Sequence, residues 1–158
     1  MVLSKEEISA KAHRQAELIV INSKTTEEAC RKLLLELMND VNMYKRNASI
    51  RRNIIQRSGI DNVVDTNPAA RGGDSLFFAD SIDSILNNMT VKKMYFSVKF
   101  LYYANLYRQI FGEDIAKYTE DLFRYLVDDN TNRRKIMKKI KQEKALLTFS
   151  ELFKLKPL

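Results

Sequence analysis

Apolar residues recur at three- and four-residue intervals along most of this chain, which is the spacing of one face of an α-helix. The first such stripe includes Ala12 and Ala16, and it follows Ser4 with Glu7 three residues later. This Ser-x-x-Glu spacing is typical of a capping box at the start of a helix. The pattern therefore predicts a first helix that begins after Ser4 and ends at about residue 21.

A second capping box begins with Thr25 and has Glu28 three residues further on. Leu33, Leu37 and Val41 then lie four residues apart, so they share one side of the predicted helix. We expect this second helix to end near Lys45.

Residue types that favour helix starts and turns divide the next part of the chain. Asn47 predicts the cap of a short third helix that ends at about Arg57. Asn-Pro and Gly-Gly pairs then predict a loop at about residues 59–73, and Asp74 predicts the cap of a fourth helix. We expect that helix to end at the Asn-Asn pair of residues 87–88.

The longest apolar run predicts a central helix from Thr90 to Phe111, closed by Gly112. Apolar residues occur on both sides of this helix, so most of it should be buried. Most of its aromatic residues are accordingly expected to form the core of a bundle, and they are Tyr95, Phe96, Phe100, Tyr102, Tyr103 and Tyr107.

Two further helices are expected in the last third of the chain. The pair Glu113–Asp114 favours the first turn of one of them, because carboxylates stabilise a helix N-terminus, and that helix should end near Asp129. Asn130 or Thr131 is expected to cap a final helix that runs through Phe153. Strand-type alternation is nowhere sustained, so residues 1–158 are expected to form a single all-α domain, a bundle of six or seven helices.

The composition is that of a globular protein. Of the 158 residues, 45% are hydrophobic and 30% charged, which separates the chain from disordered sequences. The one cysteine, Cys30, can form no internal disulfide. The first residues contain no apolar stretch of signal-peptide length, and no window approaches the length of a transmembrane helix, so a cytoplasmic protein is expected.

The net charge of +7 suggests a polyanionic partner, and its distribution strengthens that interpretation. Residues 41–60 contain five basic residues, and the only acid nearby is Asp40 just before them. Residues 133–144 contain seven basic residues and one acid, Glu143. By contrast, residues 113–129 contain six acids against Lys117 and Arg124, which suits contact with basic neighbours.

Arg134, Lys138 and Lys141 are spaced to line one face of the last helix. Like charges three or four residues apart destabilise a helix, so such a row is easier to understand if a phosphate backbone neutralises it. The alternative is a row that serves only solubility. The residues predicted to contact RNA phosphates are Lys45, Arg46, Arg51, Arg52, Arg134, Lys138 and Lys141. Tyr44, beside Lys45, is the aromatic residue to test for base stacking.

Catalytic and metal-binding patterns are weak. The single histidine, His13, lies between Ala12 and Arg14 and is expected at the surface. Asp80 and Asp83 fit the solvated face of a helix better than a metal site. The segment Arg71–Asp74 could bind an anion at a helix start, but a plain turn fits it better. We therefore expect a non-catalytic protein without metal or cofactor.

Three short stretches share a pattern with a known family. The first is Thr25-Thr26 with Arg31-Lys32-Leu33-Leu34, followed at the end of the same predicted helix by Tyr44. The second is Val98-Lys99-Phe100-Leu101-Tyr102-Tyr103-Ala104, and the third is Ala145-Leu146-Leu147-x-Phe149-x-Glu151. In this order they resemble the early, central and closing helices of the small helical subunit of type III CRISPR effector complexes. Ser97 and Leu106 stand where that family has arginines.

This resemblance implies a structural subunit of a ribonucleoprotein that takes part in antiviral defence. Several copies would stack along a backbone of other subunits that holds the crRNA. Each copy would hold the duplex of crRNA and target through backbone contacts, without reading its sequence.

Two other functions remain open. The chain could be a helical protein-interaction adaptor, of the kind found in viruses or phages, with an apolar groove for a partner helix. It could also be a small nuclease or other hydrolase, which would require cleavage that depends on acids such as Asp80 or Asp83.

Overall fold

The computed structural model describes the backbone of residues 3–58 and 68–154, and the side chains of residues 3–57 and 83–153. Within these ranges the chain forms six α-helices and no strand, which confirms the all-α prediction. The helices are α1 (Lys5–Asn22), α2 (Thr26–Ser58), α3 (Pro68–Phe111), α4 (Thr119–Asp128), α5 (Asn130–Gln142) and α6 (Phe149–Lys154), with a 3₁₀ turn, η2 (Ala116–Tyr118), before α4.

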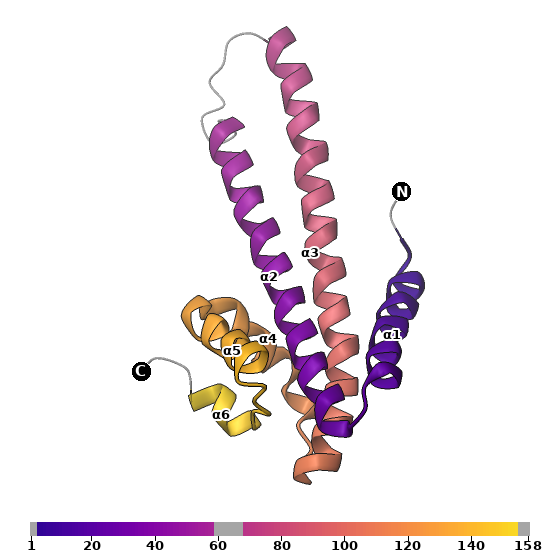
Figure 1. Cartoon of the computed structure of the whole chain (residues 1–158). Coiled ribbons are helices and arrows are strands. Elements are labelled where there is room, and N and C mark those ends of the chain that lie inside the picture. The colour runs from indigo at the N-terminus through magenta and orange to yellow at the C-terminus, as the bar shows by residue number, and fades with distance from the viewer. Residues whose placement is uncertain (1–2, 59–67, 155–158) are drawn as a thin grey trace.

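Two long helices dominate the molecule. Figure 1 shows α2 and α3 side by side as an antiparallel hairpin, with α1 along one flank and α4, α5 and α6 grouped on the other. These flanking helices cover the half of the hairpin nearer to the start of α2 and the end of α3, whereas the opposite half projects beyond them. Where side chains are described, we call the projecting part the arm, defined by residues 45–57 of α2 and 83–90 of α3, and we call residues 3–44 and 91–153 the body.

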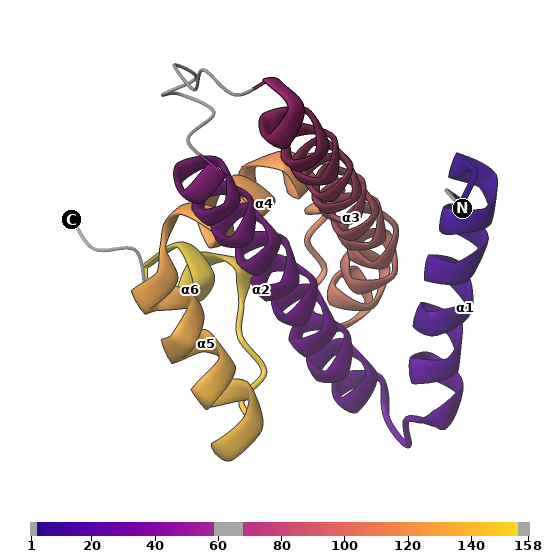
Figure 2. The same ribbon diagram turned by 90° about the horizontal axis from the view of Figure 1, so that it is seen from above.

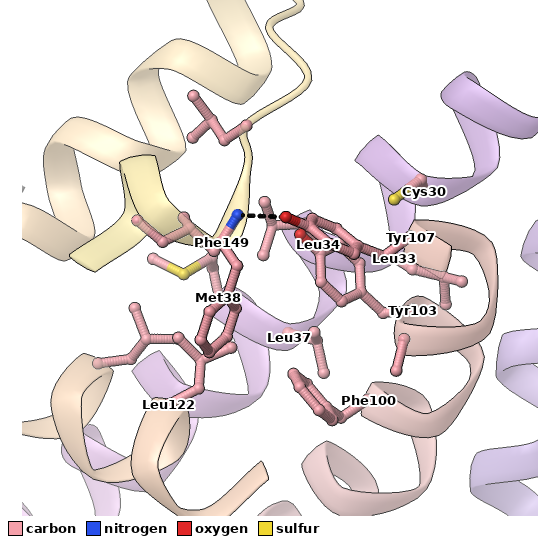
Figure 3. Packing of buried hydrophobic residues seen from close by; sticks show 14 of the residues in the cluster. Cys30, Leu33, Leu34, Leu37, Met38, Phe100, Tyr103, Tyr107, Leu122 and Phe149 are labelled. Carbon is pink, nitrogen blue, oxygen red and sulfur yellow. Dashed lines mark hydrogen bonds between the residues drawn. The ribbon is translucent and has the colours of Figure 1, made fainter. Parts of the chain in front are cut away.

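The core lies entirely in the body. Leu33, Leu37 and Phe100 are fully buried between α2 and α3. Figure 3 shows Tyr103 and Tyr107 as neighbours on α3, and their rings are tilted by 42°. The Tyr107 hydroxyl accepts a 2.9 Å hydrogen bond from the backbone N–H of Phe149. The predicted aromatic core is thereby confirmed: five of its six residues are buried, and Tyr102 is partly exposed. Burial, with a smaller contribution from Glu27, raises the pKa of the Cys30 thiol to about 12.

The predicted helix starts at Ser4 and Thr25 are correct. The Ser4 side chain accepts from the Glu7 N–H at 3.1 Å, and the Thr25 hydroxyl accepts from the Glu28 N–H at the same distance. Gly112, with φ of 74°, ends α3 as expected, because this left-handed conformation is easy only for glycine.

Two predicted helix breaks are wrong. α2 continues through Asn47, and α3 continues through Thr90 without interruption at residues 87–88. In both places the cap-type side chain bonds a carbonyl one turn earlier in its own helix. The Asn47 amide donates to the Met43 carbonyl at 2.8 Å, and the Thr90 hydroxyl donates to the Leu86 carbonyl at 3.1 Å. The hydrogen-bond donors of these side chains therefore find acceptors within a continuous helix, and no helix start is needed to satisfy them.

The predicted loop at residues 59–73 is wrong for its second part, residues 68–73. Residues 59–67 lie outside the described residues, and the backbone is helical from Pro68 onward. Asp74 and the glycines before it therefore lie inside α3 and begin no helix. The segment Arg71–Asp74 consequently has no helix N-terminus that could bind an anion.

The last third of the chain also departs from the prediction. The pair Glu113–Asp114 precedes the 3₁₀ turn, and α4 begins only at Thr119. Asp129, not Asn130 or Thr131, caps α5, since its carboxylate accepts from the Asn132 N–H at 3.1 Å. The predicted final helix is interrupted after Gln142, where Lys144 has φ of 50°.

Candidate nucleic-acid interface

The helix with the densest basic run, α5, crosses α2 at Asn42. The Arg133 guanidinium Nε donates to the Asn42 side-chain oxygen at 2.6 Å, and the Asn42 amide nitrogen lies 3.0 Å from the Met137 sulfur. Lys45 and Arg46 follow Asn42 by three and four residues, which is one helical turn or about 5 Å along the axis. The two basic segments of the sequence therefore meet at this crossing.

The solvent face of α5 is basic. Ile136 and Ile140 are buried against the body, whereas Arg134, Lys138 and Lys141 are exposed. At 100° per residue these three lie on the side of the helix away from the isoleucines. All three are accessible to a ligand at once.

The basic residues of α2 do not all lie on the same side. Arg46 and Arg52 are exposed and Lys45 is half-buried. Lys45 and Arg52 are seven residues apart, so they share the side of α2 that faces α5 at Asn42. Arg51 follows Asn42 by nine residues, which places it on the opposite side of the helix. Arg46 lies about 100° from Lys45 around α2, so of the four predicted residues of this helix only Lys45 and Arg52 share the side beside α5.

The predicted residues lack carboxylate partners within the described part of the chain. Four ion pairs occur there, and their basic partners are Lys32, Lys93 and Lys99, the last with two carboxylates. None of them includes any of the seven residues predicted to contact phosphate. Arg52 makes one weak contact, 3.4 Å from its guanidinium to the Ser49 hydroxyl. Within the described ranges, no carboxylate therefore pairs with these seven basic side chains.

Arg133 has a structural role that the charge pattern did not reveal. Its side chain is buried and donates at 2.7 Å to the Leu126 carbonyl, at the end of α4, and at 2.6 Å to the Asn130 side chain. Burial, together with the neighbouring Arg134 charge, lowers the pKa of its guanidinium from the ordinary value. The available signal was its position three residues before Ile136, on the apolar side of the helix.

A buried ion pair, which no sequence pattern indicated, holds α2 and α3 together. The Lys99 ammonium, 1% exposed, lies 3.1 Å from the Asp40 carboxylate and 3.4 Å from Glu36. Asp40 was expected to oppose the basic run that follows it, but it points to Lys99 instead. Burial raises the pKa of Asp40, although the Lys99 charge opposes this change.

Tyr44 is not a free stacking platform. It is half-buried and meets Phe123 of α4 edge-to-face, with the ring centroids 5.1 Å apart. Aromatic stacking on bases therefore has no support at this position, and phosphate contact is the interaction that the surface offers.

The acidic segment is used partly for local contacts. Glu120 pairs with Lys93 of α3 at 3.3 Å, and Asp114 accepts from the Ala116 N–H at 3.1 Å. Asp129 caps α5. These contacts fix η2, α4 and α5 against the hairpin and place α5 where it crosses α2.

The remaining chemical candidates are few. His13 is exposed, and its Nδ1 lies 2.7 Å from the Tyr102 hydroxyl. Asp83 is exposed, while the side chains of Asp74 and Asp80 lie outside the described residues. In the described ranges no three histidine, cysteine or acidic side chains are grouped so that they could hold a metal ion. No helix there combines the length and the apolar character needed to cross a bilayer.

Comparison with known proteins gave no match to a family model, to a curated protein or to a solved structure. The family resemblance therefore rests on the three sequence motifs, and the functional argument rests on the surface described above.

Proposed function

We propose that this protein is a non-catalytic RNA-binding subunit of a ribonucleoprotein. The observation that supports this most strongly is the exposed row of Arg134, Lys138 and Lys141, without ion-pair partners among the described residues, beside Lys45 and Arg52 at the crossing of α5 with α2. Five basic side chains on two helices that contact each other at Asn42 can contact successive phosphates.

Binding of this kind is electrostatic and independent of base sequence. Each basic residue that neutralises a phosphate releases condensed counterions, so affinity falls steeply as salt rises. The surface offers no accessible aromatic ring at Tyr44, which favours contact with the backbone of a duplex over stacking on single-stranded bases.

The family resemblance suggests the assembly in which this would happen. In a type III CRISPR effector complex the small subunit would hold the crRNA–target duplex in the cytoplasm, with other subunits and further copies of itself as neighbours. A basic surface on α2 and α5 and a body held together by apolar packing are compatible with that role.

A salt titration of RNA affinity tests the proposal. The probe is an RNA duplex of about 20 base pairs, the length of a guide–target duplex, and binding is measured by fluorescence anisotropy over a range of KCl concentrations. The variant replaces Arg134, Lys138 and Lys141 by Glu. The matched control replaces Lys5, Lys11 and Arg14 by Glu, three exposed basic residues of α1 on the other flank.

The α5 variant should bind more weakly, and its slope of log K against log[salt] should become shallower by roughly 2 to 3, the value expected for three lost phosphate contacts. The α1 control changes net charge equally and should keep the slope of the parent protein. Equal slopes in the parent and the α5 variant would remove α5 from the interface. RNA that is cleaved in the presence of Mg²⁺ would contradict the non-catalytic assignment.

A further inference from the structure

A second stripe on α2, distinct from its core-facing side, has the spacing of a coiled-coil seam. Met43, Asn47, Ile50 and Ile54 follow one another at intervals of four, three and four residues, as the a and d positions of heptads do. We call these four residues the α2 seam.

The α2 seam is accessible along its length. Met43 and Ile50 are each 40% exposed, and Asn47 and Ile54 are half-buried. An apolar stripe of this length at heptad spacing is normally covered by another helix. Its single polar member, Asn47, uses its amide nitrogen within its own helix, and one polar a-position is compatible with a paired seam.

A cavity of about 430 Å³ opens at the lower end of the α2 seam. Met43 of α2 lines one wall and Leu18 of α1, which is 56% exposed, lines the other. Figure 2 shows why the space exists, since α1 diverges from α2 with distance from their connection. The Lys99–Asp40 ion pair forms part of the floor and is already satisfied, so the cavity leaves room for apolar side chains between its walls.

Along residues 42–57 of α2 the charges beside the seam are all positive, whereas Glu36 and Lys92 both line the cavity at its lower end. Arg46 and Arg51 occupy the g and e positions that flank it, and Arg57 follows it at the next d position. Residues 42–57 contain no acid. The Arg51 Nε is enclosed and has no hydrogen-bond acceptor in the described structure, although a guanidinium in such a place normally has one.

We propose that the α2 seam docks an amphipathic helix of a partner protein whose e and g positions are acidic. Apolar side chains of that helix cover Met43, Ile50 and Leu18, and its carboxylates pair with Arg46 and Arg51. Charge at e and g positions selects the partner of a coiled coil, and here it selects an acidic one.

A second copy of the chain fits this surface poorly. Two α2 seams facing each other would bring Arg46 and Arg51 of one copy against those of the other, and like charges across a seam disfavour pairing. The acidic helix of the chain, α4, buries its own apolar residues in the body, including Leu122 and Leu126. RNA would neutralise the arginines but would leave Met43 and Ile50 in contact with water.

The docking site and the RNA surface lie on different sides of α2. Lys45 and Arg52 occupy the f positions of the same heptads, opposite the α2 seam. The two proposals are therefore independent, and the subunit would be able to hold RNA on one side and a protein helix on the other.

The test uses two synthetic peptide helices of about three heptads with Ile and Leu at the a and d positions. One has Glu at e and g, and the other has Lys. Binding of each labelled peptide to the full chain is measured by fluorescence anisotropy. The variants are Met43→Ala with Ile50→Ala, which remove apolar contacts, and Arg51→Glu, which reverses a flanking charge.

The matched control is Leu86→Ala, an exposed apolar residue of the arm that is 38% exposed and belongs to α3. The Glu peptide should bind at least ~10-fold more tightly than the Lys peptide, because charge at e and g positions discriminates between partners. The double variant Met43→Ala with Ile50→Ala should bind the Glu peptide more weakly by a similar factor, whereas Leu86→Ala should leave this affinity unchanged. Arg51→Glu should shift the preference toward the Lys peptide.

Equal binding of both peptides, or no binding of either, would overturn the proposal. So would a parent dimer in sedimentation velocity that Ile50→Ala dissociates, since the occupant would then be a second copy. If Met43→Ala with Ile50→Ala weakened RNA binding but left peptide binding unchanged, the α2 seam would be part of the RNA surface and not a docking site for a helix. Circular dichroism of each variant shows whether it keeps the helical fold.

Discussion

The same two helices form two different environments in the body and in the arm. In the body, Leu37 of α2 and Phe100 of α3 are fully excluded from solvent. In the arm, no residue of 45–57 or 83–90 is buried. The difference comes from the neighbours, since α1, α4, α5 and α6 enclose the hairpin only in the body. Two helices alone cannot enclose a side chain on all sides, whereas five or six can.

This contrast separates stability from recognition. The body buries the apolar surface on which folding depends. The arm contributes little burial but displays basic and apolar residues to partners. Substitutions should accordingly divide into those that unfold the protein and those that change only what it binds.

The largest expected effect is in the body core. Phe100→Ala should lower the free energy of unfolding by about 4 kcal/mol, because it removes a buried ring and leaves a cavity. Urea denaturation followed by circular dichroism measures this change. A loss below about 1 kcal/mol would mean that the body is not closely packed around this residue.

The next effect lies where the body meets the arm. Asp40→Ala should cost about 3 kcal/mol, because it leaves the Lys99 ammonium buried without its closest carboxylate. The same denaturation experiment applies, and Glu36→Ala is the matched control, since that carboxylate is 40% exposed and more distant at 3.4 Å. Similar losses in the two variants would show that the ion pair is not held in a buried environment.

The raised pKa of Asp40 also makes stability depend on pH. Its carboxylate binds a proton more readily in the folded than in the unfolded chain, so its contribution to the free energy of unfolding falls as pH rises from the ordinary value of 3.8 through the raised value. Asp40→Asn removes this titration. The stability of the parent relative to this variant should therefore decline as pH rises above 3.8, over the interval in which the Asp40 carboxyl loses its proton in the folded chain. A difference that grows over that interval would contradict the direction of the shift.

The adjacent residues Arg133 and Arg134 should respond differently to the same substitution, with smaller effects on stability than those above. Arg133→Met should cost about 2 kcal/mol, because the Leu126 carbonyl and the Asn42 side chain lose a buried donor. Arg134→Met should change stability by less than about 0.5 kcal/mol but weaken RNA binding. Urea denaturation and RNA-binding anisotropy are measured on both variants. If Arg134→Met lost stability and Arg133→Met lost only RNA affinity, the structural and RNA-binding roles of the two residues would be reversed.

The smallest effect is expected in the arm. Ile50→Ser should change the free energy of unfolding by less than about 0.5 kcal/mol, since this side chain is already 40% exposed. A loss comparable to that of Phe100→Ala would show that the arm is covered in the free protein. It would also remove the distinction between body and arm.

The sequence pattern was sufficient for the helical class and for most of the core. Helical periodicity identifies which side of a helix is apolar, and this placed Phe96, Phe100 and Tyr103 in the core. It failed at Asn47 and Thr90, because a side chain that can cap a helix can also bond its own helix internally. Local pattern contains no information on which of the two will occur.

The surface was harder to predict than the core. Basic residues that are consecutive in sequence, such as Arg133 and Arg134, have opposite roles once α5 packs on α2. The contact between Asn42 and Arg133 of α5 joins residues that are 91 positions apart, so it cannot be predicted from local residue spacing. The α2 seam was overlooked for a different reason, since the predicted break at Asn47 divided its heptads between two helices.

The burial of Cys30 gives this protein a reporter of its own opening. A thiol whose pKa is about 12 is protonated at neutral pH, and enclosed next to Tyr103 and Tyr107 it cannot meet an alkylating reagent in the folded body. Its rate of modification therefore measures how often the body opens. Cysteines introduced at Ser49 or Asn53, both exposed in the arm, would react in the folded state, so a probe can be attached there selectively while the native thiol remains in place.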